Sequence, residues 1–262
     1  METNKGWIGR SKDEYKYYTS RPWSLEDVGV FWDSVEDYDD INDKLYPYFK
    51  RFTNSEVLLK DSISLDYKDV GCVLDIQTRS GRGTKFWQEK FINASFKCVD
   101  FSEGLLEKAK KRLQSYENVE FVKTLTTSFD LVEKFDIIIC YETAEHVYDY
   151  EVFVESLSKH LKDDGVIILT CPNVSWEVVH WITAIIGFNH SEGPHRFIGY
   201  KKLLNAFESS NLIVAGYNTT IFLPFNNKFS IACDTFLSKF LPRWIKRMIM
   251  LRHSFILTRR IK

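Results

Sequence analysis

Two aspartates and a glycine-bearing loop are spaced in a way that suits a nucleotide-like ligand. The stretch GCVLDIQTRSGRGT, residues 71–84, runs from an apolar segment containing Asp75 into a polar loop with Gly81 and Gly83. Open α/β sheets bind such ligands where a strand ends in a glycine turn and a helix begins. Asp100 ends the next predicted strand, about 25 residues after Asp75. An acid at that place accepts hydrogen bonds from ribose hydroxyls in dinucleotide-binding folds, and this role is favoured over helix capping because Ser102 can cap the following helix.

Three further side chains could act as a general base. Glu145 and His146 lie just beyond the predicted fourth strand, and His195 lies beyond the fifth. A carboxylate or imidazole within reach of a hydroxyl can remove its proton during group transfer. Each histidine also has a structural alternative, as a helix-start residue for His146 and as a loop residue for His195. Arg196 could pair with an anionic group of a substrate, because its planar fork suits carboxylate or phosphate.

An alternation of apolar strands and amphipathic helices from residue 68 onward must position these side chains. The segment 135–140 (FDIIIC) is apolar enough to be buried on both faces. Such an alternation predicts a doubly wound, mostly parallel sheet. The predicted strands are Cys72–Gln77, Ala94–Asp100, Val119–Val122, Phe135–Cys140, Val166–Cys171, Leu212–Leu223 and Ser254–Ile261. The predicted helices are 83–91, Ser102–Leu113, Asp149–Leu161, which Asp163-Asp164-Gly165 would stop, and Tyr200–Ser209.

The chain divides into a helical part and a sheet-bearing part. Apolar residues at helical spacing begin after Ser24, a plausible N-cap, and a second such pattern covers residues 41–52. We therefore expect an N-terminal helical cap over residues 1–66 and the main domain over residues 67–262. Within that domain we expect a lid-like insertion over 174–198 and a basic amphipathic segment over 224–252.

Composition excludes several classes of protein. Lys+Arg 35 against Asp+Glu 36 gives a formal net charge of -1, so charge does not favour a nucleic-acid partner. The chain has 5 cysteines without a CxxC pair, and four of them lie in predicted strands, which indicates a reducing compartment and neither disulfides nor a metal site. The first residues lack an apolar signal segment, and the apolar window 178–188 is too short to span a bilayer. We expect a cytoplasmic protein with no obligatory metal.

Four blocks of sequence resemble the class I S-adenosylmethionine-dependent methyltransferases, closest to their small-molecule branch. They are VLDIQTRSGRGT, CVDFSEGLLEKAKKRL, FDIIICYETAEHVYDYEVFVESLSKHLKDDGVIILTCPN and HRFIGYKKLLNAFESSNL, and they cover about residues 70–222. The resemblance implies a Rossmann-like α/β sheet of about seven strands with the last strand antiparallel. It also implies S-adenosylmethionine as cofactor and methyl transfer to an oxygen or nitrogen of a small or lipid-linked molecule.

The resemblance also implies roles for individual residues. Asp75 and the loop residues Gln77, Thr78, Arg79 and Gly81 would face the methionine part of the cofactor. Asp100 would hold the ribose hydroxyls, and Phe101 would pack on the adenine. Tyr141 and Glu142, just past the fourth strand, would border the transferring methyl, with Glu142 on the substrate side. The sequence CYET in this place argues against the N-P-P-[FYW] or D-P-P-[FYW] type of methyltransferase that modifies DNA amino groups or glutamine side chains.

The loop departs from the family pattern D-x-G-x-G-x-G. Gln77 and Arg79 stand where the first two glycines belong, and only Gly81 remains. Those glycines permit positive φ and close approach of the backbone to the ligand. Two hypotheses follow. In one, Arg79 points away from the cofactor or grips its carboxylate and the enzyme works; in the other, the chain is a non-catalytic methyltransferase-like binding module.

Two segments outside the family blocks have surface properties of interest. Residues 176–188 (WEVVHWITAIIGF) are apolar nearly all round, which is typical of a buried helix and also suits a lid over the acceptor. Residues 236–252 (FLSKFLPRWIKRMIMLR) are amphipathic and basic, and together with the first segment they could lie against a membrane. The opposite charge collects between Glu26 and Asp43, and the ordinary interpretation of both runs is a solvated face.

Overall fold

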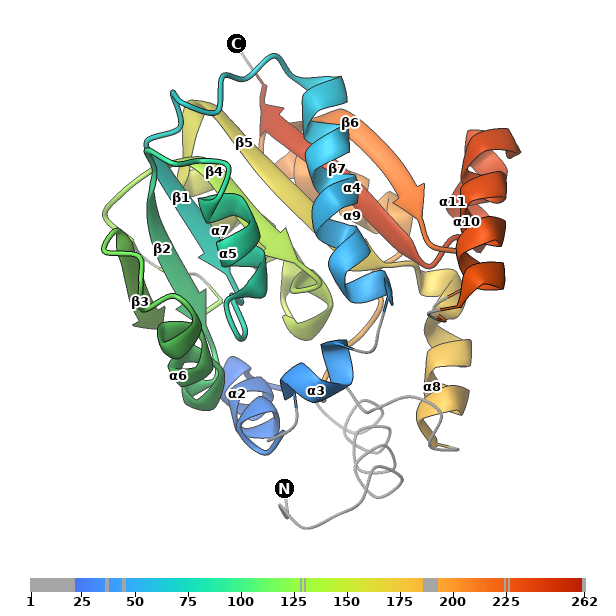
Figure 1. Ribbon diagram of the computed structural model, residues 1–262, viewed down its shortest axis with the longest axis horizontal. Helices are drawn as coiled ribbons and strands as arrows, with labels where there is room; N and C mark the ends of the chain where they lie inside the picture. The colour runs from blue at the N-terminus through green and yellow to red at the C-terminus, as the bar shows by residue number, and fades with distance from the viewer. Residues whose placement is uncertain are drawn as a thin grey trace.

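A seven-stranded sheet forms the centre of the molecule, with the strands in the order β3-β2-β1-β4-β5-β7-β6 (Figure 1). The computed structural model describes residues 22–35, 38–43, 46–127, 129, 131–185, 193–223, 225 and 227–260. Strands β1 to β5 pair in parallel, whereas β7 pairs antiparallel with both β5 and β6. The expected doubly wound sheet with an antiparallel last strand is therefore confirmed.

The strand residues are apolar where the sheet is covered on both faces. The inner strand β4 is buried along nearly its whole length, as its continuous run of apolar side chains requires. The strands span Cys72–Ile76 (β1), Ser95–Asp100 (β2), Val119–Lys123 (β3), Phe135–Tyr141 (β4), Leu161–Pro172 (β5), Leu212–Thr220 (β6) and Arg252–Arg259 (β7). Asp75 and Asp100 thus lie at or near the carboxyl ends of adjacent parallel strands.

The start of β5 differs from the prediction. Helix α7 covers Tyr150–Lys159, and the chain enters β5 at Leu161, five residues before the predicted Val166. The amide of Phe135 donates to the carbonyl of His160 at 2.8 Å, and Leu161 pairs with Phe135 across a register shift in β4. A Cβ at Gly165 would lie 2.9 Å from the Phe135 carbonyl oxygen. The predicted helix-stop sequence is therefore part of an irregular strand, because glycine there permits close backbone approach.

Helices cover both faces of the sheet. In Figure 1, α4 (Tyr46–Ser62), α5 (Arg82–Gln88) and α6 (Glu103–Arg112) lie in front of the sheet, and α7 and α9 (Tyr200–Ser209) lie behind it. Helices α8 (Glu177–Ile185), α10 (Lys228–Phe240) and α11 (Arg243–Ile249) stand beyond the β6–β7 side. Two short 3₁₀ turns, η1 (Ala144–His146) and η2 (Val174–Trp176), follow β4 and β5.

Two further helices, α2 (Leu25–Asp33) and α3 (Tyr38–Asp43), lie at the edge where the parallel strands end (Figure 1). Ser24 caps α2 through a reciprocal capping box with Asp27, as its position before the apolar pattern predicts. Helix α2 comes so close to the chain after β2 that a Cβ at Gly29 would collide with the carbonyl oxygen of Phe101. A glycine is therefore required on this face of the helix.

Two carboxylates of the acidic run between Glu26 and Asp43 connect α2 and α3 to the edge of the sheet by hydrogen bonds. Oδ1 of Asp33 accepts hydrogen bonds from the Ser102 hydroxyl at 2.6 Å and from the amide of Gly104 at 2.9 Å. The carboxylate of Asp39 accepts from the Ser80 hydroxyl at 2.6 Å and from the guanidinium groups of Arg82 and Arg112. The expected solvated face is wrong for Asp39, because tertiary contacts place its partly buried carboxylate on three donors, whereas Asp33 stays exposed while it makes its two hydrogen bonds.

Candidate cofactor and acceptor site

The loop after β1 takes a backbone conformation that favours glycine at three alternate positions. The φ angle is 56° at Gln77, 55° at Arg79 and 79° at Gly81. A left-handed conformation costs a non-glycine residue about 1–2 kcal/mol. Surrounding hydrogen bonds hold the loop in this conformation. The Thr78 amide donates to the Val99 carbonyl at 3.0 Å, and the Gly81 amide donates to the Thr78 carbonyl at 3.0 Å. The loop therefore keeps the backbone that a glycine-rich sequence would adopt.

Asp75 and Asp100 both hold this loop. Oδ2 of Asp75 accepts from the hydroxyls of Thr84 at 2.5 Å and Thr78 at 3.1 Å. Asp100 accepts from the amides of Arg79 at 2.7 Å and Ser102 at 2.9 Å. Burial raises the pKa of Asp75 to about 7, although the two threonine hydroxyls lower it. Burial likewise raises the pKa of Asp100 to about 6, against the lowering effect of the Ser102 and Arg79 amides.

The other residues expected around the cofactor lie close to these aspartates. Phe101 follows Asp100, is 2% exposed and lies under α2. Gln77 is 3% exposed, and neither atom of its side-chain amide has a hydrogen-bond partner among the described residues. Tyr141 directs its side chain into the core, where Trp87 Nε1 donates to its hydroxyl at 2.8 Å and its ring packs on Phe52. At the edge of the sheet Tyr141 therefore contributes its main chain.

Glu142 occupies the position where the ends of β4, β5 and β7 meet. Its φ angle is 48°, another left-handed value. Oε1 accepts from Arg252 Nε at 2.8 Å and from the Thr170 hydroxyl at 2.7 Å, while the main-chain oxygen accepts from Arg79 Nη2 at 2.6 Å. Burial would raise the pKa of Glu142, but the charges of Arg252 and Arg51 outweigh it and hold the pKa below its ordinary value. Glu142 is therefore an ionised carboxylate at the expected substrate side.

The three candidate bases come together, although His195 lies about 50 residues after Glu145 and His146 in the sequence. The ring centroids of His146 and His195 are 6.1 Å apart, and the Arg196 amide donates to the Glu145 carbonyl at 2.8 Å. His146 Nδ1 lies 3.1 Å from the Pro194 carbonyl oxygen, and His195 Nδ1 lies 2.8 Å from that of Gly193. A carbonyl only accepts, so both rings carry the proton on Nδ1 and present Nε2 as the basic nitrogen.

The fourth candidate of this group, Arg196, lies against Tyr148. Its Nη2 donates to the Tyr148 carbonyl at 3.3 Å, and its guanidinium lies over the Tyr148 ring, 5.1 Å from the centroid. Trp23 packs edge-on against the same ring and donates from Nε1 to the His146 carbonyl at 2.8 Å. Contacts with the helical N-terminal part thus support the turn that carries His146.

Two arginines of this site are absent from the sequence-based set. Arg51 on α4 is 5% exposed and Arg252 at the start of β7 is 6% exposed. The sequence offered two signals for them. Arg51 lies on the buried side of an amphipathic helix, and Arg252 is the first residue of an apolar strand. Neither pattern identifies a partner, because the partners are brought together only by the strand order and the packing of α4.

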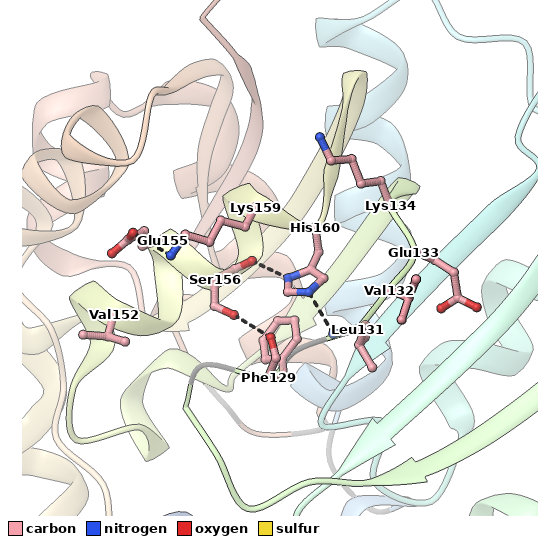
Figure 2. Close-up of a pocket in the computed structure, with 10 residues that line it drawn as sticks. All are labelled: Phe129, Leu131, Val132, Glu133, Lys134, Val152, Glu155, Ser156, Lys159 and His160. Carbon is pink, nitrogen blue, oxygen red and sulfur yellow. Dashed lines mark hydrogen bonds and ion pairs between the residues drawn. The ribbon is translucent and has the colours of Figure 1, made fainter.

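A surface hollow near α7 is separate from this site. Figure 2 shows it between α7 and the segment 129–134, with His160 at its base. His160 Nε2 accepts from the Leu131 amide at 3.0 Å, and Nδ1 lies 2.7 Å from the Ser156 carbonyl oxygen. Both nitrogens of His160 therefore serve structural hydrogen bonds, and none of the sequence-predicted site residues lines the hollow.

Comparison with known proteins identifies a methyltransferase domain in the chain. Residues 74–167 match a family model described as a methyltransferase domain. The ubiquinone biosynthesis O-methyltransferase of Bartonella quintana is 30% identical over 177 residues, which span 65% of this chain and 66% of that protein. The chain thus aligns with slightly less than two thirds of that relative. The malonyl-[acyl-carrier protein] O-methyltransferase of Acetivibrio thermocellus is 30% identical over 109 residues, 42% of this chain and 38% of that protein.

Solved structures share the fold. The N-methyltransferase NodS from Bradyrhizobium japonicum WM9, in complex with S-adenosylhomocysteine, superposes with a TM-score of 0.60 at 12% identity. The superposition covers 90% of this chain and 100% of that chain. Sequence relatives, family model and fold all indicate a methyltransferase. The chain thus has a methyltransferase domain over residues 74–167 and the fold of the class I S-adenosylmethionine-dependent methyltransferases.

Proposed function

We propose that this protein transfers a methyl group from S-adenosylmethionine to an oxygen of a small molecule. The observation that carries the proposal is the loop conformation: Gln77 and Arg79 take the left-handed backbone that the family's glycines would take. The names of the sequence relatives, both O-methyltransferases, support oxygen over nitrogen as the methylated atom. The expected role of Asp100 rests on its place at the end of β2, directly against the loop.

The residues around the loop fit the cofactor. The unpartnered side-chain amide of Gln77 is an orphan polar group within the described part of the chain, and leaving such a group unsatisfied costs about 1–3 kcal/mol. A ligand with amino, carboxylate and hydroxyl groups would satisfy it. Gln77 and Thr78 would contact the methionine part, Asp100 the ribose and Phe101 the adenine. When bound, S-adenosylmethionine supplies a methyl group activated by its sulfonium.

The chain's own contribution to transfer is to orient the acceptor and accept its proton. Nε2 of His146 or His195 would take the proton of an acceptor hydroxyl, because the carbonyl partners hold the proton of each ring on Nδ1. Glu145 lies beside His146 and would act as the alternative base. Enclosure by the aromatic rings of Trp181, stacked on His195 at 5.0 Å, would keep water from this position.

Calorimetric titration with S-adenosylmethionine and S-adenosylhomocysteine tests the cofactor site. We expect micromolar binding by the wild type and at least about a tenfold loss in Asp100→Asn, since hydrogen bonds to a charged acceptor are worth about 1.5–3 kcal/mol. Asp69→Asn, at an exposed position before β1, is the matched control and should bind like the wild type. Absence of binding by the wild type would favour the alternative function, a non-catalytic binding module.

A lipid-linked acceptor is a finer hypothesis, supported by the surface of α10 and α11. Large apolar side chains on these helices are exposed, and the exposed charges among them are basic. The apolar set is Phe229, Phe236, Phe240, Trp244 and Met248, and the basic set is Lys228, Lys239, Arg243 and Arg247. Asp234, the acid of α10, is buried and accepts from the Phe222 amide at 3.2 Å. Such a face suits an anionic membrane surface.

Vesicle flotation tests that hypothesis. No helix within the described residues is long and apolar enough to cross a membrane. We expect the protein to float with vesicles containing phosphatidylglycerol and not with pure phosphatidylcholine. Phe236→Ser and Arg243→Glu should each reduce flotation, whereas Val57→Ser, at an exposed position of α4, should not. Equal flotation of all variants would contradict a role for α10 and α11.

A further inference from the structure

Three buried arginines from distant parts of the chain surround Glu142. Arg79 comes from the loop after β1, Arg51 from α4 and Arg252 from the start of β7. All three are less than one tenth exposed: 5% for Arg51, 8% for Arg79 and 6% for Arg252. Arginines are costly to bury unless anionic groups compensate them. The balance of charge in this cluster therefore indicates what the site is built to receive.

Glu142 compensates only part of the charge. Its carboxylate is shared between Arg252 Nε and the Thr170 hydroxyl, whereas Arg79 reaches only its main-chain oxygen. Arg51 donates from Nε to the Tyr48 carbonyl at 2.9 Å, and its guanidinium lies 4.3 Å from the Tyr48 ring centroid. Both of these partners are uncharged. Burial, together with the positive charges of Arg252 and Arg79, lowers the pKa of Arg51. Burial would also lower the pKa of Arg79, but neighbouring groups that include Glu145 and Glu142 raise it, so the crowding of cations is felt at Arg51.

Hydroxyl groups beside the arginines add donors without partners. Ser254 pairs with Thr170 and Thr220 pairs with Arg252, so these side chains share the sheet face that α4 covers. Ser254 Oγ and Thr220 Oγ1 are buried and have no hydrogen-bond partner within the ranges that the structure describes. Nε of Arg79 is likewise buried and has no hydrogen-bond partner within these ranges. Unpartnered donors near several guanidinium groups are suited to the oxygens of an anion.

The cluster lies on the acceptor side of the expected methyl group. Arg51 and Arg252 belong to α4 and β7, next to β5, whereas the ribose acid Asp100 is on β2 at the other side of β1. Glu142, at the end of β4, stands between the two regions. We propose that Arg51, Arg252 and Arg79 form an anion subsite that binds a carboxylate or phosphate group of the methyl acceptor. This inference rests on the proposed function and defines its substrate class as acidic small molecules.

Calorimetric titration of the full-length chain saturated with S-adenosylhomocysteine, using benzoate and inorganic phosphate as probes, tests the subsite. Benzamide has the shape of benzoate without its charge and is the neutral comparison. We expect the wild type to bind benzoate or phosphate at least about tenfold more tightly than benzamide, because a guanidinium pairs with an oxyanion by charge-assisted hydrogen bonds. Failure of both anions to saturate the protein, or equal binding of benzamide, would overturn the proposal.

Substitutions at Arg51 locate the binding. Arg51→Gln should lower the affinity for the anion at least about tenfold, Arg51→Lys should lower it less because it keeps the charge, and Arg260→Gln, at an exposed position, should leave it unchanged. Circular dichroism and 5′-methylthioadenosine affinity establish that each variant is folded. Unchanged anion binding in folded Arg51→Gln would overturn the assignment.

The cofactor's own carboxylate is the other source of an anion, and 5′-methylthioadenosine, which lacks it, separates the two. If Arg51→Gln weakens S-adenosylhomocysteine but not 5′-methylthioadenosine, the subsite serves the cofactor and the acceptor assignment is wrong. If each nucleoside binds the variant with the same affinity as the wild type while benzoate binding is lost, the subsite serves the acceptor. If the wild type binds neither nucleoside, the proposed function fails, and the anion titration of the free protein still reports on the arginines.

Discussion

Nη2 of Arg79 donates to the main-chain oxygen of Glu142 at 2.6 Å and so joins the loop after β1 to the end of β4. The family resemblance places the methionine part of the cofactor at this loop and the methyl group at the end of β4. Arg79 therefore spans the region that this part of the cofactor would use. Its charged side chain stands where family members have only a hydrogen atom.

Removal of the Arg79 side chain should open the cofactor site. We expect Arg79→Gly to bind S-adenosylhomocysteine about tenfold more tightly than the wild type, because the ligand no longer displaces a hydrogen bond of a charged group worth about 1.5–3 kcal/mol. Calorimetry measures the change, with Gln77→Gly as the matched control that relaxes the neighbouring backbone but keeps the guanidinium. Weaker binding by Arg79→Gly would mean that Arg79 grips the cofactor.

Backbone strain at Gln77 should appear in stability. Gly fits a φ of 56° without steric cost, whereas Ala does not, so Gln77→Gly should be more stable than Gln77→Ala by about 1 kcal/mol. Urea denaturation gives the free energies of unfolding. The reciprocal change, Gly81→Ala, should be destabilising at φ 79°, where a Cβ would also lie 3.2 Å from Ala109. Equal stability of the two Gln77 variants would show that the loop relaxes out of the left-handed region.

The buried carboxylate of Asp75 should make stability depend on pH. Its folded pKa of about 7 lies above the unfolded value of about 3.9, so the native state binds the extra proton between these values. The stabilisation that this group contributes to the folded state is therefore fully present below about pH 4 and is lost as the pH rises through about 7. Asp75→Asn, which resembles the protonated form, should be more stable than the wild type at pH 8, less so at pH 5, and close to it only near pH 4. Urea denaturation at these pH values checks this, with Asp69→Asn as an exposed control whose profile should follow the wild type.

The contact of α3 with the loop should influence cofactor binding. Asp39 accepts from the Ser80 hydroxyl at 2.6 Å and from two arginines, which hold its pKa below the ordinary value against the effect of burial. We expect Asp39→Asn to lower S-adenosylhomocysteine affinity about three- to tenfold, because the loop loses charge-assisted hydrogen bonds on one side. Calorimetry tests this. Asp33→Asn, which loosens α2 from Ser102 instead, distinguishes a loop effect from general loosening of the helical part.

The sequence by itself determined the succession of strands and helices and the places where the strands carrying Asp75 and Asp100 end. Hydrophobic periods and turn residues act over a few neighbouring positions, so the placement of Asp75 and Asp100 after β1 and β2, and the cap at Ser102, could be predicted. The same local signals failed at residues 161–165, where pairing of Leu161 with Phe135 extends β5 and overrides the helix pattern. Strand pairing decides the structure there, because the hydrogen bonds of β5 depend on the neighbouring strand β4, which the local sequence pattern does not contain.

Only the tertiary structure decided the composition of the site. Glu142 and Arg252 are 110 positions apart, and no spacing in the sequence indicates that they pair at 2.8 Å. The interpretation of Asp39 as a solvated acid failed for the same reason, since its partner Ser80 lies on another element. The left-handed backbone of Gln77 is likewise a property of the folded loop. Local periodicity follows from neighbouring residues, whereas side-chain partners follow from strand order and register, which the whole chain sets together.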